Sequence, residues 1–169
     1  MRYLKEFIVV LSFVFVASMA TAQSNYKTSI GLRLGPSYGF TIKHFISDKI
    51  ALEGLVTSRY YGLGAWGSNP GIMFTGLAAW HFPIGNIQGF NWFIGGGFHI
   101  GVLEGYNNHP FLRDNRPYIL TGLDVVGGVE YTLPNAPFTF QADLKPSIHL
   151  IEYVGIWSDE VAVSVRYTF

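Results

Sequence analysis

Ser147 and His149 are the residues of this sequence whose types and spacing come nearest to a catalytic arrangement. They stand two residues apart in a segment where polar and apolar residues alternate, so their side chains would share one face of a strand. A hairpin around the turn at 134–137 would bring Asp124 across from Ser147. Serine, histidine and a carboxylate can act as nucleophile, general base and orienting group in acyl transfer. Because Ser and His also meet by chance on polar strand faces, we predict no catalytic residue, and keep this pair as the alternative.

Nine charged side chains form a second candidate site. All nine fall in the phase of their strands that carries the small and polar residues. Five positive charges against four negative nearly balance, as burial in a narrow space requires, because an unpaired buried charge is costly. The nine residues are Arg33, Lys43, Glu53, Arg59, Asp124, Glu130, Asp143, Lys145 and Arg166.

Hairpin geometry predicts partners within this charged set. A turn at 47–49 places Lys43 directly opposite Glu53, within reach across the strands. The hairpin around the turn at 134–137 places Lys145 diagonal to Asp124. The charges are therefore predicted to form a network of salt bridges that keeps the interior closed, and an ion or proton path is the alternative.

The other histidines do not suggest a metal site. His44 falls in the apolar phase near a strand end, where its ring would reach an interface. His81 and His99 face inward among small residues, and His109 lies in the longest predicted loop. No spacing of His, Asp and Glu matches a metal site, and Gly95-Gly96-Gly97 lies inside a strand with no helix after it, unlike a phosphate loop. The sequence thus predicts no cofactor and no metal.

Strands must position these residues, and eight segments show the period-two alternation of strands. Three short turns alternate with longer connections; the turns are 47–49, 84–90 and 134–137, and the longer connections 61–71, 103–117 and 151–160. An even strand number with this alternation is typical of small outer-membrane barrels. The predicted fold class is all-β, an eight-stranded antiparallel transmembrane up-and-down β-barrel. The segments are 28–35, 39–46, 50–60, 72–83, 91–102, 118–133, 138–150 and 161–169.

The N-terminal residues have the pattern of a secretory signal peptide. Arg2 and Lys5 precede an apolar run, and Ala20-Thr21-Ala22 provides the small residues that signal peptidase requires. The run is shorter than the ~20 residues of a spanning helix. We expect 1–22 to be a signal peptide and 23–169 to be the barrel domain.

Composition excludes some functions. Charged residues make up 13% of the chain and aromatic residues 17%, whereas an ordinary soluble domain carries roughly 25% charged residues. A net charge of zero without a basic run argues against nucleic-acid binding. The absence of cysteine excludes disulfides and thiolate metal sites.

The direction of the two strand faces separates a membrane barrel from a soluble one. A soluble, lipocalin-like binding barrel would turn its apolar face inward. The polar phase here combines glycines with a few long charged residues, which suits the narrow interior of an eight-stranded barrel. Aromatic residues gather near both strand ends, as in the girdles at bilayer interfaces. They are Trp80, Phe82, Phe90, Trp92, Tyr131, Phe138, Tyr167 and Phe169 at one rim and Tyr38, Tyr60, Phe74 and Tyr118 at the other.

The last strand resembles the C-terminal assembly signal of bacterial outer-membrane barrels. Val163, Val165, Tyr167 and Phe169 form its apolar face, and the sequence ends on the second aromatic. We expect the strand to be recognised by the barrel-assembly machinery, and to close the barrel against the first strand because an open edge cannot persist in a bilayer.

Six further segments carry a family resemblance, and they are 29–35, 39–45, 51–54, 75–77, 80–81 and 95–97. They resemble the small outer-membrane β-barrel proteins of the Bacteroidota, which are similar in architecture to the barrel of outer-membrane protein A. The resemblance implies an outer-membrane location, contact with outer-membrane lipid and lipopolysaccharide, and a structural or interaction role through the extracellular loops. It supplies no active-site residues and no extracellular partner. A lipid A-modifying enzyme that uses Ser147 and His149 is the alternative.

Overall fold

The computed structural model describes residues 26–59, 71–104, 117–152, 154–158 and 160–169. The predicted signal peptide, Tyr60 and His109 lie outside the described residues, as does most of the predicted loops 61–71 and 103–117. Among the residues described, no helix is long and apolar enough to cross a membrane.

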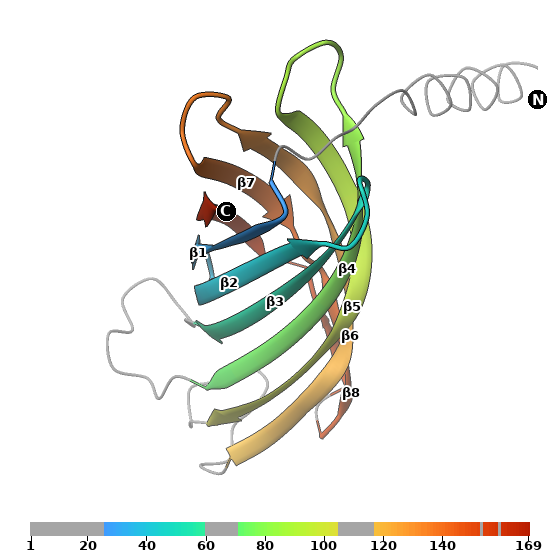
Figure 1. Cartoon of the computed structure of the whole chain (residues 1–169). Helices are drawn as coiled ribbons and strands as arrows, with labels where there is room; N and C mark the ends of the chain where they lie inside the picture. The colour runs from blue at the N-terminus through green and yellow to red at the C-terminus, as the bar shows by residue number, and fades with distance from the viewer. Residues whose placement is uncertain (1–25, 60–70, 105–116, 153, 159) are drawn as a thin grey trace, which may run out of the picture.

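Ten strand segments form a closed antiparallel barrel of eight strands (Figure 1). β7 and β8 are successive parts of the seventh strand, and β9 and β10 of the eighth. The pairing of β5 with β6 joins the two halves of the sheet and closes the ring. The predicted fold class is confirmed. The segments are β1 (Thr28–Leu34), β2 (Ser37–Phe45), β3 (Ile50–Arg59), β4 (Ile72–Pro83), β5 (Phe90–Glu104), β6 (Pro117–Thr132), β7 (Phe138–Leu144), β8 (Ser147–Ile151), β9 (Gly155–Trp157) and β10 (Val161–Thr168).

The last strand closes the barrel against the first, as predicted. Ile30 pairs with Tyr167, and the register continues along both strands. At the end of the seam, Thr28 and Phe169 exchange two backbone hydrogen bonds of 3.0 and 2.8 Å. The final residue is therefore part of the closed ladder.

Two predicted strand boundaries were wrong. β2 begins at Ser37, so the connection between the first two strands is shorter than the sequence suggested. The predicted loop at 151–160 contains strand residues, because β8 continues to Ile151 and β9 (Gly155–Trp157) pairs with β8. Glu152 adopts a left-handed conformation with φ of 59° at the turn between them.

The polarity of the wall is opposite to that of a soluble protein. Phe40 and Phe98 are 65% and 64% exposed on the outer face, whereas Arg33, Lys43 and Arg166 are at most 1% exposed inside. Large apolar side chains outside and buried charges inside are the pattern of a barrel wall in contact with lipid. The predicted direction of the two faces is confirmed for these residues.

The interior also holds apolar side chains on the side of β3 to β6. Leu55, Leu77 and Phe93 belong to one buried cluster there. Gly97 also faces inward, and a Cβ there would collide with the carbonyl oxygen of Gly76 on the neighbouring strand. Gly97 is therefore required by the close approach of two backbones.

Two aromatic residues differ from the predicted girdles. Tyr118 is 6% exposed and packs inside with Leu120 and Trp157, because the inward phase of β6 runs through the even-numbered residues. Phe82 keeps its outward phase, but it is 8% exposed since the Trp92 ring stacks on it with centroids 4.6 Å apart.

Candidate functional site: a charge network inside the barrel

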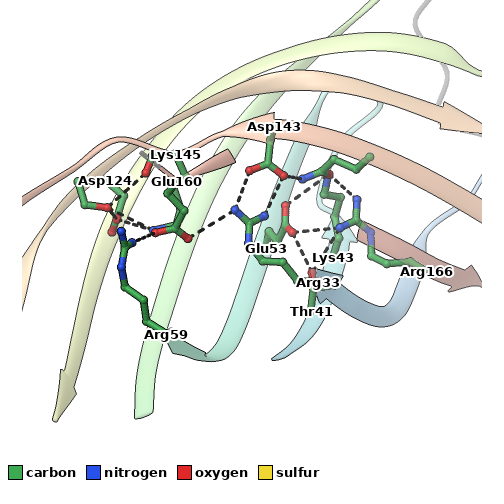
Figure 2. A network of polar contacts seen from close by, with 12 residues as sticks. Arg33, Thr41, Lys43, Glu53, Arg59, Asp124, Asp143, Lys145, Glu160 and Arg166 are labelled. Atoms are coloured by element: carbon green, nitrogen blue, oxygen red, sulfur yellow. Dashed lines mark hydrogen bonds and ion pairs between the residues drawn. The ribbon is translucent and has the colours of Figure 1, made fainter. Parts of the chain in front are cut away.

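Two groups of charged side chains fill the interior, joined by Arg33 and Asp143 (Figure 2). The labelled side chains come from β1, β2, β3, β6, β7 and β10 and from residues next to β7 and β10, and they point toward one another (Figure 2). We call the group nearer the chain termini the terminal-end cluster; its members are Thr41, Lys43, Glu53, Glu130, Gln141 and Arg166. The other is the loop-end cluster, with members Arg59, His99, Asp124, Lys145, Ser147, His149 and Glu160.

The terminal-end cluster alternates two cations with two carboxylates. Lys43 Nζ lies 3.4 Å from Glu53 Oε2 and 2.8 Å from Glu130 Oε2. Arg166 Nη1 lies 3.1 Å from Glu53 Oε1, and its Nη2 lies 2.7 Å from Glu130 Oε2. Each carboxylate thus meets both cations, which satisfies the condition for burying charge. The predicted register of Lys43 opposite Glu53 is confirmed.

Neutral groups complete the hydrogen bonding of this cluster. Gln141 Oε1 accepts a hydrogen bond of 2.5 Å from Lys43 and another from Arg166. Thr41 donates to Glu53 Oε1 over 2.8 Å. Such added hydrogen bonds offset part of the desolvation of buried ions.

Tyr26 closes the terminal end of the network. Its hydroxyl donates to Glu130 Oε1 over 2.8 Å, and its ring packs edge-on against Phe45 with centroids 5.2 Å apart. Burial raises the pKa of the Tyr26 hydroxyl well above its ordinary value. The hydroxyl therefore stays protonated and remains a donor to the carboxylate.

Arg33 connects the two clusters. It donates two parallel hydrogen bonds of 2.8 Å to Asp143, the bidentate geometry that suits a guanidinium and a carboxylate. The same guanidinium lies 3.6 Å from Glu160 Oε1 in the loop-end cluster. Asp143 also accepts from Gln141 over 2.8 Å, so hydrogen bonds and ion pairs run continuously through the interior.

Lys145 and Glu160 organise the loop-end cluster. Lys145 Nζ lies 3.0 Å from Asp124 Oδ1, as the predicted diagonal arrangement requires, and 3.3 Å from Glu160 Oε2. Arg59 reaches the same Glu160 oxygen at 3.2 Å and lies over the Trp157 ring, 4.3 Å from its centroid. This cation–π contact adds to the attraction that holds Arg59 inside.

The Ser147 and His149 arrangement differs from a catalytic triad. Asp124 does pair with Ser147 across the strands, as predicted. However, the short hydrogen bond of Ser147 Oγ, 2.6 Å, goes to Asp124 Oδ1, and His149 Nδ1 meets His99 Nε2 at 2.9 Å. His99 Nδ1 lies 2.9 Å from the other oxygen of Asp124. The carboxylate therefore accepts the hydrogen bond of the serine hydroxyl, whereas in a triad the imidazole accepts it.

The other histidines lie as their strand phase predicts. His81 is 2% exposed, stacks on Phe93 with centroids 5.1 Å apart, and places Nε2 3.5 Å from Lys43 Nζ. His44 faces outward near a strand end, where its Nδ1 lies 2.9 Å from Thr28 Oγ1. The described residues contain no group of three or more His, Asp or Glu side chains placed to hold one metal ion.

All nine predicted charges lie buried in this network, and the sequence analysis missed a tenth. Glu160 is 2% exposed and contacts Arg33, Arg59 and Lys145. It was assigned to a loop, although it stands in the inward phase two residues before Ala162. With Glu160 included, five carboxylates face five cations, so the imbalance in the predicted set disappears.

Comparisons with known proteins identify the fold. No protein-family model matches the chain, and no curated protein sequence matches it. Among solved structures, the N-terminal β-barrel domain of Pseudomonas aeruginosa OprF matches with a TM-score of 0.64 and 16% identity, covering 88% of this chain and 100% of that one. Ail, the attachment invasion locus protein of Yersinia pestis, matches with a TM-score of 0.47 and 13% identity over 87% of this chain and 99% of that one. The first likeness supports an eight-stranded barrel of the outer-membrane type.

Proposed function

We propose that this protein is an integral outer-membrane barrel with a structural or interaction role and an interior closed by its charge network. The observation that carries the proposal is the polarity of the wall: apolar side chains such as Phe40 and Phe98 are exposed, while ten charged side chains are buried. The fold shared with the OprF barrel domain supports the same location. Both termini and the short turns face the periplasm, and the longer loops face outward as the contact surface.

Closure of the interior follows from the network. Arg33, Lys43 and Arg166 reach across the barrel to carboxylates on other strands, with N–O distances of 2.7 to 3.6 Å. Opening a continuous water path would require separating these ion pairs, and an eight-stranded barrel has space for little more than its own side chains. The charges therefore serve to fix the barrel and do not line a channel.

The membrane location is tested by expressing the full chain in a Gram-negative host and fractionating the envelope. We expect the protein in the outer-membrane fraction, with migration on a gel that changes after heating because the folded barrel resists detergent. Protein found in the soluble periplasm without detergent would instead support the lipocalin-like alternative. A folded periplasmic protein expressed in parallel controls for leakage.

The closed interior is tested separately in planar bilayers. The wild-type protein should give no stable conductance steps, since no path crosses the network. Stable steps in the wild type that grow when Lys43 or Glu53 is truncated to Ala would mean that these residues line a pore. A Lys27→Ala variant is the matched control, because this exposed lysine precedes β1.

We infer no enzymatic activity from Ser147 and His149. The Ser147 hydroxyl is committed to Asp124, and both residues are at most 2% exposed inside the barrel, away from the lipid that a lipid A-modifying enzyme must reach. Ser147→Ala and His149→Ala should leave the lipid A mass spectrum of expressing cells unchanged. A wild-type-dependent modification that either variant abolishes would establish the enzyme alternative.

A further inference from the structure

Outward-facing glycines interrupt the apolar outer wall at the middle of β3 and β4. Gly54 and Gly76 pair across these strands, and each stands between larger outward residues. A Cβ at Gly76 would make only ordinary contact, 3.7 Å from the Phe98 ring, and one at Gly54 would lie 3.3 Å from the Ile42 side chain. Unlike the inward Gly97, neither position is blocked by neighbouring backbone, and Gly76 has space for a side chain. The barrel's own backbone packing therefore does not account for glycine there.

The missing side chains leave a groove in the outer face. Its first part, about 550 Å³, runs from His44 and Leu52 to Ala78 and Phe98. A second part, about 400 Å³, shares Ile42, Gly54, Gly76 and Phe98 with the first and extends to Phe40. Apart from His44, the outward-facing side chains that line both parts are apolar. The two parts together form one apolar groove with a polar residue at one end.

The groove lies within one leaflet of a bilayer. It follows β2 from His44 to Phe40, which is about 13 Å at about 3.3 Å per residue, and a strand tilt of about 40° reduces its depth to about 10 Å. One leaflet contributes about 15 Å of hydrocarbon, half of the ~30 Å core. Because β2 ends at Phe45, the His44 end lies at the rim near the chain termini. The groove therefore descends from headgroup level toward the bilayer centre.

Two lysines stand at that rim. Thr28 pairs with His44, so Lys27 lies at the edge next to His44, and its carbonyl accepts a 2.9 Å hydrogen bond from the Phe45 amide. Lys49 lies in the turn between β2 and β3, and its carbonyl accepts a 2.7 Å hydrogen bond from the His81 amide on β4. Cationic side chains at a membrane surface attract anionic headgroups.

We propose that this groove binds one acyl chain of an anionic phospholipid from the periplasmic leaflet, with the phosphate near Lys27, Lys49 and His44. The proposal rests on the membrane location and orientation proposed above. A concave groove suits a flexible chain, whereas the convex wall of a second barrel would leave it empty and lose packing contacts. The lysines then set the preference for an anionic over a zwitterionic headgroup.

The test is native mass spectrometry of the purified full chain in mild detergent, with added phosphatidylglycerol or phosphatidylcholine. We expect the wild type to bind one phosphatidylglycerol in preference to phosphatidylcholine. Gly76→Leu should weaken this binding by more than about tenfold, because leucine occupies space that several lipid methylene groups would fill. Lys27→Gln combined with Lys49→Gln should remove the headgroup preference and retain the chain.

Gly127→Leu is the matched control. Gly127 is also outward-facing, on β6, with only a 3.7 Å contact from a Cβ to the Phe93 oxygen, and it lines neither part of the groove. Equal lipid binding by Gly76→Leu and Gly127→Leu would overturn the site, and so would a wild type that binds no lipid. A wild-type dimer that Gly76→Leu converts to a monomer would show that a second copy occupies the groove instead. Heat-modifiable migration of every variant, measured in parallel, separates these outcomes from failure of the membrane location.

Discussion

Removing the Arg166 guanidinium should destabilise the barrel far more than removing an exposed charge. In Arg166→Met, Glu53 and Glu130 lose contacts of 3.1 and 2.7 Å and are left with Lys43 as the one shared cation of the terminal-end cluster. All these groups are at most 3% exposed, so water and salt cannot compensate. Breaking a buried ion pair by removing one partner costs about 3–5 kcal/mol. We expect a loss of that size in the free energy of unfolding.

A double variant tests whether charge balance is the cause. Glu130→Gln alone leaves an excess positive charge and should cost a similar amount. In Arg166→Met with Glu130→Gln, Lys43 and Glu53 remain as a neutral pair. The double variant should therefore lose about 2 kcal/mol less than the sum of the single variants, since contacting groups couple by up to about 3 kcal/mol.

The assay is reversible guanidinium unfolding in lipid vesicles, followed by tryptophan fluorescence. Asp48→Asn is the control, because an exposed charge outside the network should change stability by less than about 0.5 kcal/mol. Strict additivity of the two single variants would refute the reasoning, because it would mean that Glu130 does not respond to the charge of Arg166. A single-variant loss no larger than the control would refute it as well.

Three further predictions concern residues other than Arg166 and Glu130. Gly97→Ala should fail to refold into a heat-modifiable barrel, because its Cβ collides with a neighbouring backbone, whereas the outward Gly76→Ala should refold normally on the same gel. Tyr26→Phe should lower the free energy of unfolding by about 1.5–3 kcal/mol in the vesicle assay, because Glu130 loses a hydrogen bond from the tyrosine. Phe169→Ala should reduce the amount of assembled protein in cells and leave refolding in vesicles nearly unchanged. The variant keeps the backbone hydrogen bonds to Thr28 and removes only an exposed ring. Equal losses in cells and in vesicles would argue against a role of Phe169 in assembly.

The period-two pattern predicted most of the fold because lipid outside and polar residues inside impose opposite demands on alternate residues. The pairing register of neighbouring strands could also be predicted wherever a short turn connects them, as for Lys43 and Glu53. The pattern failed where the polarity of a residue does not indicate whether its side chain faces inward or outward. Tyr118 is an aromatic that fills the interior beside Leu120, so its type gave no sign of its direction.

The sequence predicted which residues belong to the candidate site more fully than it predicted which of them contact one another. Strand phase placed the charged residues inside, but their long side chains reach across the barrel, beyond the neighbouring strand. Lys43 approaches Glu130 more closely, at 2.8 Å, than its cross-strand neighbour Glu53, at 3.4 Å. Pairing across the barrel depends on the curvature of the closed sheet, which a linear pattern does not contain.

The network also explains how a barrel with such a uniform outer wall keeps one register. Slipping a strand by one residue turns every side chain to the opposite face. For β1 or β10 such a slip would turn Arg33 or Arg166 toward lipid, at a cost that rises from about 0–1 kcal/mol near the interface to about 2–4 kcal/mol at the bilayer centre, and would leave buried carboxylates unpaired inside. Exchange of one apolar residue for another on the outer face carries no comparable penalty. The buried charges therefore specify which closed barrel forms, even where apolar pairs could have supplied equal stability.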